Sequence, residues 1–324
     1  MAVINGTIFD DTLRGTEAND SIYGLGGDDV IFGNGGDETL YGGEGDDYLV
    51  SGYGPAGIGV SRLYGGAGSD EFGGGAGSDL SYGGVGTDYF SFSGGQDSIY
   101  GGQGSDILLL YAYNRAVNFT LGSGGSGTVT IRAAANLGFT GVTNYFGIEG
   151  LGGGSFNDTL RGNISDNTLI GNAGADSLFG MAGNDALYGG EGHDTLTGGR
   201  GRDIFAFEGE ADRHLLAADA DVLTDYDVAQ DSLVFFSRNF AGLRTASDTA
   251  DGLMGDTQIF DLLAQQFVVQ NSRVAMSTSV RLIYDRDDGL LYYDADGALS
   301  GHRAILIADL GKDLALTAAD FFIY

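Results

Sequence analysis

One acidic position recurs through this chain at a fixed spacing. The nine-residue pattern Gly-Gly-x-Gly-x-Asp-x-apolar-x occurs sixteen times, in blocks of five, five and six copies that begin at Gly6, Gly65 and Gly153. Asn167 replaces the acid at position six in one copy. The other fifteen copies carry Asp11, Asp20, Asp29, Glu38, Asp47, Asp70, Asp79, Asp88, Asp97, Asp106, Asp158, Asp176, Asp185, Asp194 and Asp203. These carboxylates are the candidate metal ligands.

Carboxylates that a repeat stacks together repel one another unless a cation lies between them. Asp side chains and the carbonyls of glycine-rich turns offer oxygen ligands in irregular geometry, which favours Ca²⁺ over Mg²⁺. Pairing each position-six residue with the one two copies ahead gives at most about ten calcium ions, and Asp20/Glu38 and Asn167/Asp185 are the weakest pairs. One isolated copy would indicate only a turn, but sixteen copies in register favour metal binding.

The elements that position these carboxylates follow from the rest of the repeat. Position eight is apolar in every copy except the one with Ser81, and a unit with one apolar side chain must stack on its neighbours to form a core. The last three residues, as in Thr195-Leu196-Thr197, fit a short strand with one inward side chain. The glycine-rich first six residues fit a turn. Two units return the chain over itself every eighteen residues, at a strand spacing of roughly 4.8 Å.

The repeat resembles the RTX family, which carries haemolysin-type calcium-binding repeats. Residues 221–227 and 230–233 resemble, more loosely, the segment that follows these repeats in secreted members. The resemblance implies an all-β fold, a right-handed parallel β-roll solenoid that folds on calcium outside the cell and leaves by type I secretion machinery. It also implies that the position-six Asp residues and the turn carbonyls hold the metal.

Composition indicates the same class of protein. The chain has 45 acidic and 15 basic residues, a net charge of −30, and no Cys. This charge disfavours a compact metal-free state and argues against nucleic acid or anionic membranes as partners. Without disulfides, bound metal is the expected means of stabilisation.

The ends of the chain bear on localisation. Residues 1–6 lack the basic and apolar regions of an N-terminal signal peptide, and no apolar run reaches transmembrane length. Residues 320–324, Asp-Phe-Phe-Ile-Tyr, resemble the acidic and hydrophobic tails of type I secretion substrates, and they also fit a last strand packed into a cap. We therefore expect a secreted, extracellular protein without an N-terminal signal peptide.

The repeat blocks divide the chain. Residues 1–109 hold the first two blocks, with a loop excursion at 51–64 that contains the single Pro. Residues 110–152 are predicted to be an irregular β insertion that continues the solenoid, with β-rich pieces at 117–121 and 128–132. Residues 153–206 form the third block.

Residues 207–324 differ in character, since Gly becomes rare and apolar residues increase. The spacing of Ile259, Leu262, Leu263 and Phe267 predicts a helix, and 280–284, 290–293 and 304–308 are predicted strands. The acidic turns between these strands lack EF-hand spacing and fit hairpin turns. We expect a small mixed α/β cap that covers the end of the roll and contains the probable secretion signal.

No enzymatic motif stands out. None of the three His residues lies in His-Glu-x-x-His, and no Gly-x-Ser-x-Gly is present. We therefore expect a non-catalytic structural, adhesive or matrix-associated protein, with cell-surface or extracellular polysaccharide as a candidate partner. The alternative is the calcium-binding accessory or secretion portion of an extracellular enzyme of the polysaccharide epimerase, protease or lipase type.

Overall fold

The computed structural model describes residues 1–52, 59–75, 77–91, 95–110, 116–132, 140–207, 220–236, 240, 243, 260–261, 264–271, 279–295 and 304–323. The chain divides into two compact units. The first comprises residues 1–114 and 120–152, and the second comprises residues 115–119 and 153–324. No helix of the described residues is long and apolar enough to cross a membrane.

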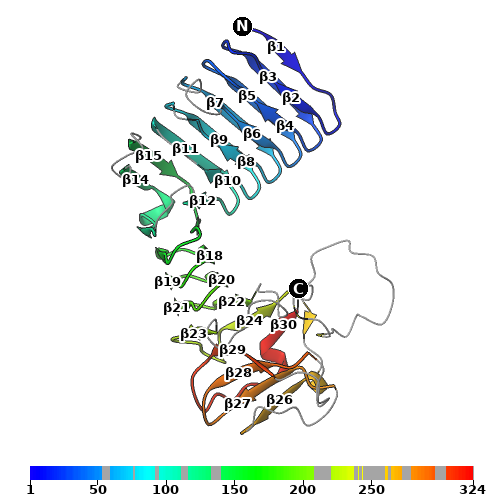
Figure 1. Cartoon of the computed structure of the whole chain (residues 1–324), viewed down its shortest axis with the longest axis vertical. Helices are drawn as coiled ribbons and strands as arrows, with labels where there is room; N and C mark the ends of the chain where they lie inside the picture. Colours follow the sequence, from blue (N-terminus) through cyan, green and yellow to red (C-terminus); the bar gives the residue numbers. More distant parts are fainter. Residues whose placement is uncertain are drawn as a thin grey trace. The chain divides into compact units, whose positions relative to one another are not determined.

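The first unit is a parallel β-roll in which each repeat contributes one strand, alternately to two sheets (Figure 1). Strands in one sheet pair in register with residues about two copies away, as in Ile22 with Leu40. One sheet has the order β1 (Val3–Asn5), β3 (Ser21–Gly26), β5 (Thr39–Glu44), β7 (Arg62–Ala67), β9 (Leu80–Val85), β11 (Gly95–Gln103), β15 (Thr140–Phe146) and β14 (Gly127–Arg132). The other has β2 (Thr12–Arg14), β4 (Val30–Phe32), β6 (Tyr48–Val50), β8 (Glu71–Gly73), β10 (Tyr89–Ser91), β12 (Ile107–Leu109) and β16 (Gly150–Gly152).

Exact stacking of the coils places like residues over like. The position-eight side chains form a closed internal row, and Ile31, Leu40 and Leu49 have no exposed surface. On the outside, each coil carries one aromatic ring, at position nine of every second copy and at Tyr64 of the excursion. The ring centroids lie 4.8 Å apart for Tyr23 and Tyr41 and 4.9 Å apart for Tyr41 and Tyr64. Offset aromatic stacking adds to the burial of the rings. The in-register coil predicted from the nonapeptide is thus the architecture of this unit.

After each interruption of the repeat, a strand pairs in parallel with a strand of the preceding coil. Strand β5 pairs directly with β7, so the chain re-enters the roll after residues 51–64, of which 53–58 lie outside the described residues. After η2 (Ser123–Gly125), β14 pairs antiparallel with β15, and β15 pairs parallel with β11. The insertion therefore adds an antiparallel strand to the edge of one sheet and returns its second strand to the roll.

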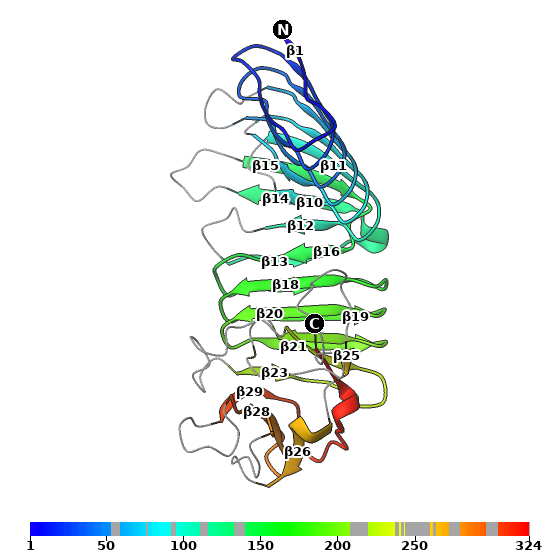
Figure 2. The same ribbon diagram turned by 90° about the vertical axis from the view of Figure 1, so that its right-hand side faces the viewer.

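The second unit contains the third repeat block and the C-terminal block, and its strands stack in the same manner (Figure 2). Leu178, Leu187, Leu196 and Phe205 form its buried row. One set of strands has the order β18 (Thr168–Ala173), β20 (Ala186–Glu191), β22 (Ile204–Phe207), β24 (Ser232–Phe235), β30 (Phe321–Ile323) and β25 (Phe260–Asp261). The other has β13 (Asn118–Thr120), β17 (Thr159–Arg161), β19 (Ser177–Ala182), β21 (Thr195–Arg200), β23 (Asp221–Leu223), β29 (Ile305–Asp309), β28 (Leu290–Tyr293), β27 (Leu282–Asp285) and β26 (Phe267–Gln270).

The C-terminal block continues both sheets of the roll and extends one of them with a meander. Strands β23 and β24 pair parallel with β21 and β22, and β27, β28 and β29 pair antiparallel in sequence at the three predicted strand positions. The predicted helix around 259–267 is wrong for the residues that the structure describes there. Strand β25 is extended, η3 (Ala264–Gln266) is one 3-10 turn and β26 begins at Phe267. Ile259, Leu262 and Leu263 lie outside the described residues. The pairing of β25 with β30 overrides the helical spacing.

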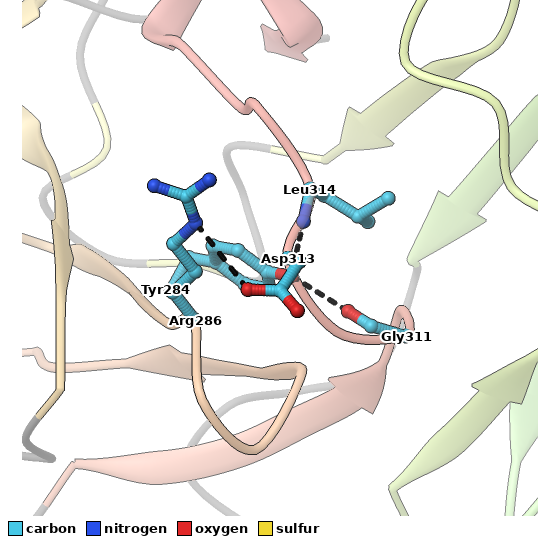
Figure 3. Close-up of polar contacts among 5 residues, drawn as sticks. All are labelled: Tyr284, Arg286, Gly311, Asp313 and Leu314. Carbon is cyan, nitrogen blue, oxygen red and sulfur yellow. Dashed lines mark hydrogen bonds and ion pairs between the residues drawn. The ribbon is translucent and has the colours of Figure 1, made fainter.

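A buried tyrosine ties the meander to the last segment of the chain (Figure 3). Tyr284 donates its hydroxyl proton to the Gly311 carbonyl at 2.6 Å and accepts from the Leu314 backbone N–H at 3.1 Å. Nearby, Arg286 and Asp313 form an exposed ion pair at 3.8 Å. Beyond this segment, the Thr317 and Asp320 side chains cap η4 (Ala318–Asp320), which leads directly into β30. The C-terminal residues are therefore integral to the sheet of the second unit.

Candidate metal centre

The position-six side chains form continuous ladders along the roll. In a typical link, the backbone N–H of Asp29 donates to Oδ1 of Asp47, two copies ahead, at 2.8 Å. The first unit has ladder I, Asp11, Asp29, Asp47, Asp70, Asp88, Asp106 and Glu149, and ladder II, Asp20, Glu38, Ser61, Asp79 and Asp97. The second unit has ladder III, Asp158, Asp176, Asp194 and Asp221, and ladder IV, Asn167, Asp185, Asp203 and Asp231. The structure thus brings together residues two copies apart, the pairing expected from the sequence.

Four ladder members fall outside the sixteen copies. They are Ser61, Glu149, Asp221 and Asp231, and they continue the ladders across the excursion, the insertion and the start of the cap. Each stands two residues before a Leu that occupies the buried row, as Asp231 does before Leu233. This shortened signature, without the glycine-rich turn, could have identified them from the sequence.

In most copies the second carboxyl oxygen of the ladder residue is buried and has no hydrogen-bond partner. Nine such oxygens occur among the described residues, on Asp29, Glu38, Asp47, Asp70, Asp88, Asp106, Asp176, Asp185 and Asp194. All nine side chains are at most 2% exposed. A buried carboxylate oxygen without a donor is costly, so each of these sites fits a cation that would complete it.

In six of the seven remaining copies a side-chain oxygen of the position-six residue is bonded to its own turn or to a hydroxyl, and Asp203 is the seventh. Residues Asp11, Asp20, Asp79, Asp158 and Asn167 accept a hydrogen bond from the backbone N–H at position two of their own copy. Asp97 accepts one from the Thr143 hydroxyl at 3.2 Å. Apart from Asp203, the candidate ligands therefore fall into two groups, which the repeat pattern itself does not separate.

The electrostatics of the first group require a counter-charge. Burial raises the pKa of Asp70 to about 7, and the neighbouring carboxylates Asp88 and Asp47 add to the rise, although the N–H of Asp47 lowers it. The pKa of Asp176 is raised to about 7 by burial, with Asp194 and Asp158 contributing, against the N–H of Asp158. Protons and metal ions both neutralise such groups, so ionised ladders at neutral pH fit bound cations.

Glycine at position one leaves room between successive turns for ligand oxygens. A Cβ on Gly24 would lie closer than 3.0 Å both to Oδ2 of Asp29 and to the carbonyl oxygen of Gly42, in the turn two copies ahead. The same two kinds of oxygen surround Gly42, Gly65 and Gly83. A carboxylate oxygen and a carbonyl from adjacent coils thus converge on the space that a side chain would fill.

The donor set suits calcium. No group of three or more acidic or histidine side chains comes together in the described parts of the chain, so carbonyl oxygens must supply the remaining ligands. Calcium accepts mixed carboxylate and carbonyl coordination of six to eight oxygens, whereas Mg²⁺ demands a stricter octahedron. The position-six residues are therefore the side chains that would hold calcium, together with the carbonyls of the turns.

A second ladder of hydrogen bonds joins the position-five residues. In it the later residue donates its backbone N–H to the side chain of the earlier one, the reverse of the order at position six. Oδ1 of Asp28 accepts from the backbone N–H of Asp46 at 2.9 Å, and Oδ1 of Asp166 accepts from Asn184 at 2.6 Å. These side chains are exposed and an amide or hydroxyl can replace them, as Asn184 does toward Arg202. Position five therefore joins the coils by hydrogen bonds that do not require a carboxylate.

A comparison with protein-family models identifies the repeat. The model of the RTX calcium-binding nonapeptide repeat matches residues 5–37, 32–54, 56–90, 93–110, 152–187, 170–205 and 179–212, just over half of the chain. Among solved structures, the AlgE6R3 subunit from the Azotobacter vinelandii mannuronan C5-epimerase matches at 25% identity and a TM-score of 0.32, over 52% of this chain and 78% of that one. No curated protein matches. The repeats that build both units and their carboxylate ladders are those of the RTX calcium-binding family, and the chain belongs to that family.

Proposed function

We propose that this chain is an extracellular, non-catalytic protein whose β-roll folds as calcium binds and then serves as a structural or adhesive component. The observation that carries the proposal is the row of buried carboxyl oxygens without donors in both units. In this account the repeats serve to couple the fold to calcium, because the ladder carboxylates cannot be buried ionised without a cation.

Because the calcium concentration is low in the cytosol and high outside the cell, this coupling determines where the chain folds. Extracellular calcium modules bind with dissociation constants of about 10⁻⁴ to 10⁻³ M, so such sites are nearly empty in the cytosol. Where free calcium exceeds the dissociation constant tenfold, each ion stabilises the fold by about 1.4 kcal/mol. Several ions together then supply as much free energy as a whole domain has. The chain is therefore expected to stay unfolded inside the cell and to fold outside it.

The segment that resembles a secretion signal supports export before folding. Phe321 and Ile323 belong to the tail that resembles a type I secretion signal, and both are buried in β30. Such a signal is accessible only while the second unit is unfolded, and low cytosolic calcium would maintain that state. Export by type I machinery and calcium-driven folding are thus two parts of one proposal.

Secretion tests this proposal directly. The full chain and a variant lacking residues 320–324 are produced in a host with and without a type I exporter. We expect the full chain in the medium only with the exporter, and retention of the variant. Exporter-independent release, or equal release of both chains, would contradict the export route. Incubating the secreted chain with candidate surface polysaccharides then tests the adhesive role.

A further inference from the structure

The turns of the repeat have one of two backbone conformations. In ten copies the residues at positions two and four both have positive φ, as for Leu25 (86°) and Gly27 (90°). We call these open turns. Their position-two residues are Leu25, Asn34, Gly43, Gly66, Gly84, Gly102, Asn172, Met181, Gly190 and Gly199. All nine partnerless carboxyl oxygens belong to copies with open turns.

Five other copies have closed turns, in which position two donates its backbone N–H to the position-six side chain of the same copy. Thr16 is an example, since its N–H and its hydroxyl both donate to Oδ2 of Asp20 at 2.7 Å. The donors of the five closed turns are Thr7, Thr16, Gly75, Gly154 and Asn163. A closed turn points the positive end of an N–H dipole at the oxygen that a cation would require. Such a turn is satisfied without metal.

Two turns with the same sequence belong to different classes. Residues 65–70 and 74–79 both read Gly-Gly-Ala-Gly-Ser-Asp. In the first, Gly66 has φ 130° and Oδ2 of Asp70 has no partner. In the second, the Gly75 N–H donates to Oδ2 of Asp79 at 3.0 Å and to Oγ of Ser51 at 2.8 Å. The adjacent coil, and not the hexapeptide, therefore decides the class.

The two ladders of the first unit differ accordingly. Ladder I has open turns at Asp29, Asp47, Asp70, Asp88 and Asp106 without interruption. On ladder II the open turn of Glu38 lies between the closed turn of Asp20 and the hydroxyl of Ser61. Further along, the Thr143 hydroxyl donates a hydrogen bond to Oδ2 of Asp97. Turn N–H groups and a hydroxyl thus satisfy the second oxygens of Asp20, Asp79 and Asp97 on ladder II, whereas that of Glu38 is buried without a partner and its open turn has no open neighbour on the ladder.

We propose that calcium binds only between two successive open turns of the same ladder, so that the ions of the first unit all lie along ladder I and none lies along ladder II. This proposal rests on the calcium-coupled folding proposed above and assigns its sites. The pairs that qualify are Asp29/Asp47, Asp47/Asp70, Asp70/Asp88, Asp88/Asp106, Asp176/Asp194 and Asp185/Asp203. The described residues therefore hold about six ions.

The identical hexapeptides supply a matched test in the full chain. Asp70→Asn and Asp79→Asn make the same chemical change, and each keeps the Oδ1 that accepts from Asp47 or Ser61. Bound calcium is counted by elemental analysis after equilibrium dialysis at fixed millimolar calcium. We expect about six ions in the wild type and in Asp79→Asn, and one or two fewer in Asp70→Asn, because Asp70 belongs to two qualifying pairs.

Equal losses in both variants, loss in Asp79→Asn alone, or loss in neither would overturn the assignment. If Asp70→Asn does not fold, Asp88→Asn and Asp97→Asn repeat the comparison on the same two ladders. Failure of the calcium-coupled folding itself would be recognised separately, because the wild type would then keep its far-ultraviolet circular dichroism without calcium.

Discussion

The backbone N–H of Asp47 donates a 2.9 Å hydrogen bond to Oδ1 of Asp70, although the excursion at residues 51–64 separates their copies in the sequence. Ladder I therefore passes from the first repeat block into the second without a gap. The sequence suggests sites confined to uninterrupted blocks, whereas this link adds a candidate site between two of them. The ladder, and not the block, is the unit that should respond to calcium.

The first prediction compares position six with position five in the third repeat block. Asp194→Asn should raise the calcium midpoint of folding several-fold and lower the number of bound ions, because Oδ2 of Asp194 is buried without a partner. Asp166→Asn should change neither quantity, since an amide oxygen can still accept from the N–H of Asn184. Calcium titrations followed by circular dichroism and by ion counting check this. Equal midpoints would show that the position-six carboxylate only shapes the turn.

The second prediction concerns glycine at position one. Gly24→Ala should destabilise the calcium-loaded roll and weaken calcium binding, because the new Cβ would collide with Oδ2 of Asp29 and the carbonyl of Gly42. Gly26→Ala, in the same turn, is the control, since its Cβ would come no closer than 3.7 Å to Glu44. Thermal melts at fixed calcium measure the difference. Equal melting temperatures for the two variants would contradict the crowding expected at position one.

The third prediction is a pH dependence. The pKa of Asp70 and of Asp176 is raised to about 7 by burial and neighbouring carboxylates, whereas an unfolded Asp titrates near 3.9. A raised folded pKa stabilises the calcium-free fold below the unfolded pKa, and this stability is lost as pH rises through the folded value. Calcium-free protein should therefore gain β-structure as the pH falls from 8 to 5.

Calcium binding should show the opposite dependence. Protons compete with the metal for the same oxygens, so apparent calcium affinity should fall as the pH drops below about 7. Protein freed of calcium by dialysis, without chelator, is used at each pH. If acidification removes β-structure from the calcium-free protein, or if the apparent calcium affinity rises as the pH falls, these carboxyl groups are not the calcium ligands.

The fourth prediction concerns the C-terminal block. Removing residues 207–324 should raise the calcium concentration needed to fold residues 153–206, because it uncovers Phe205 and removes the pairing of β22 with β24. It also removes Asp221 and Asp231, the last members of ladders III and IV. In stacked repeats an uncovered end frays and weakens its neighbours. An unchanged midpoint in the shortened chain would remove the capping role.

The nonapeptide was sufficient to predict the strands, the buried position-eight row and the pairing of carboxylates two copies apart. It could not predict the turn class, because residues 65–70 and 74–79 are identical in sequence but belong to different classes, and the second turn is held by Ser51 of the adjacent coil. It also missed Ser61 and Glu149, whose copies have lost the glycine-rich turn. Near Phe267 the helical spacing was misleading, because strand pairing across the sheet decided the local structure.

Calcium titration of the full chain by far-ultraviolet circular dichroism tests the central claim most directly. With calcium removed at pH 8, we predict a largely disordered spectrum, and with millimolar calcium a cooperative gain of β-structure that equal magnesium does not produce. A thermal melt at each calcium concentration shows whether ions retained through purification still stabilise the protein. If the calcium-free protein has the same spectrum and melting temperature as the calcium-loaded protein, the carboxylate ladders do not couple calcium to folding.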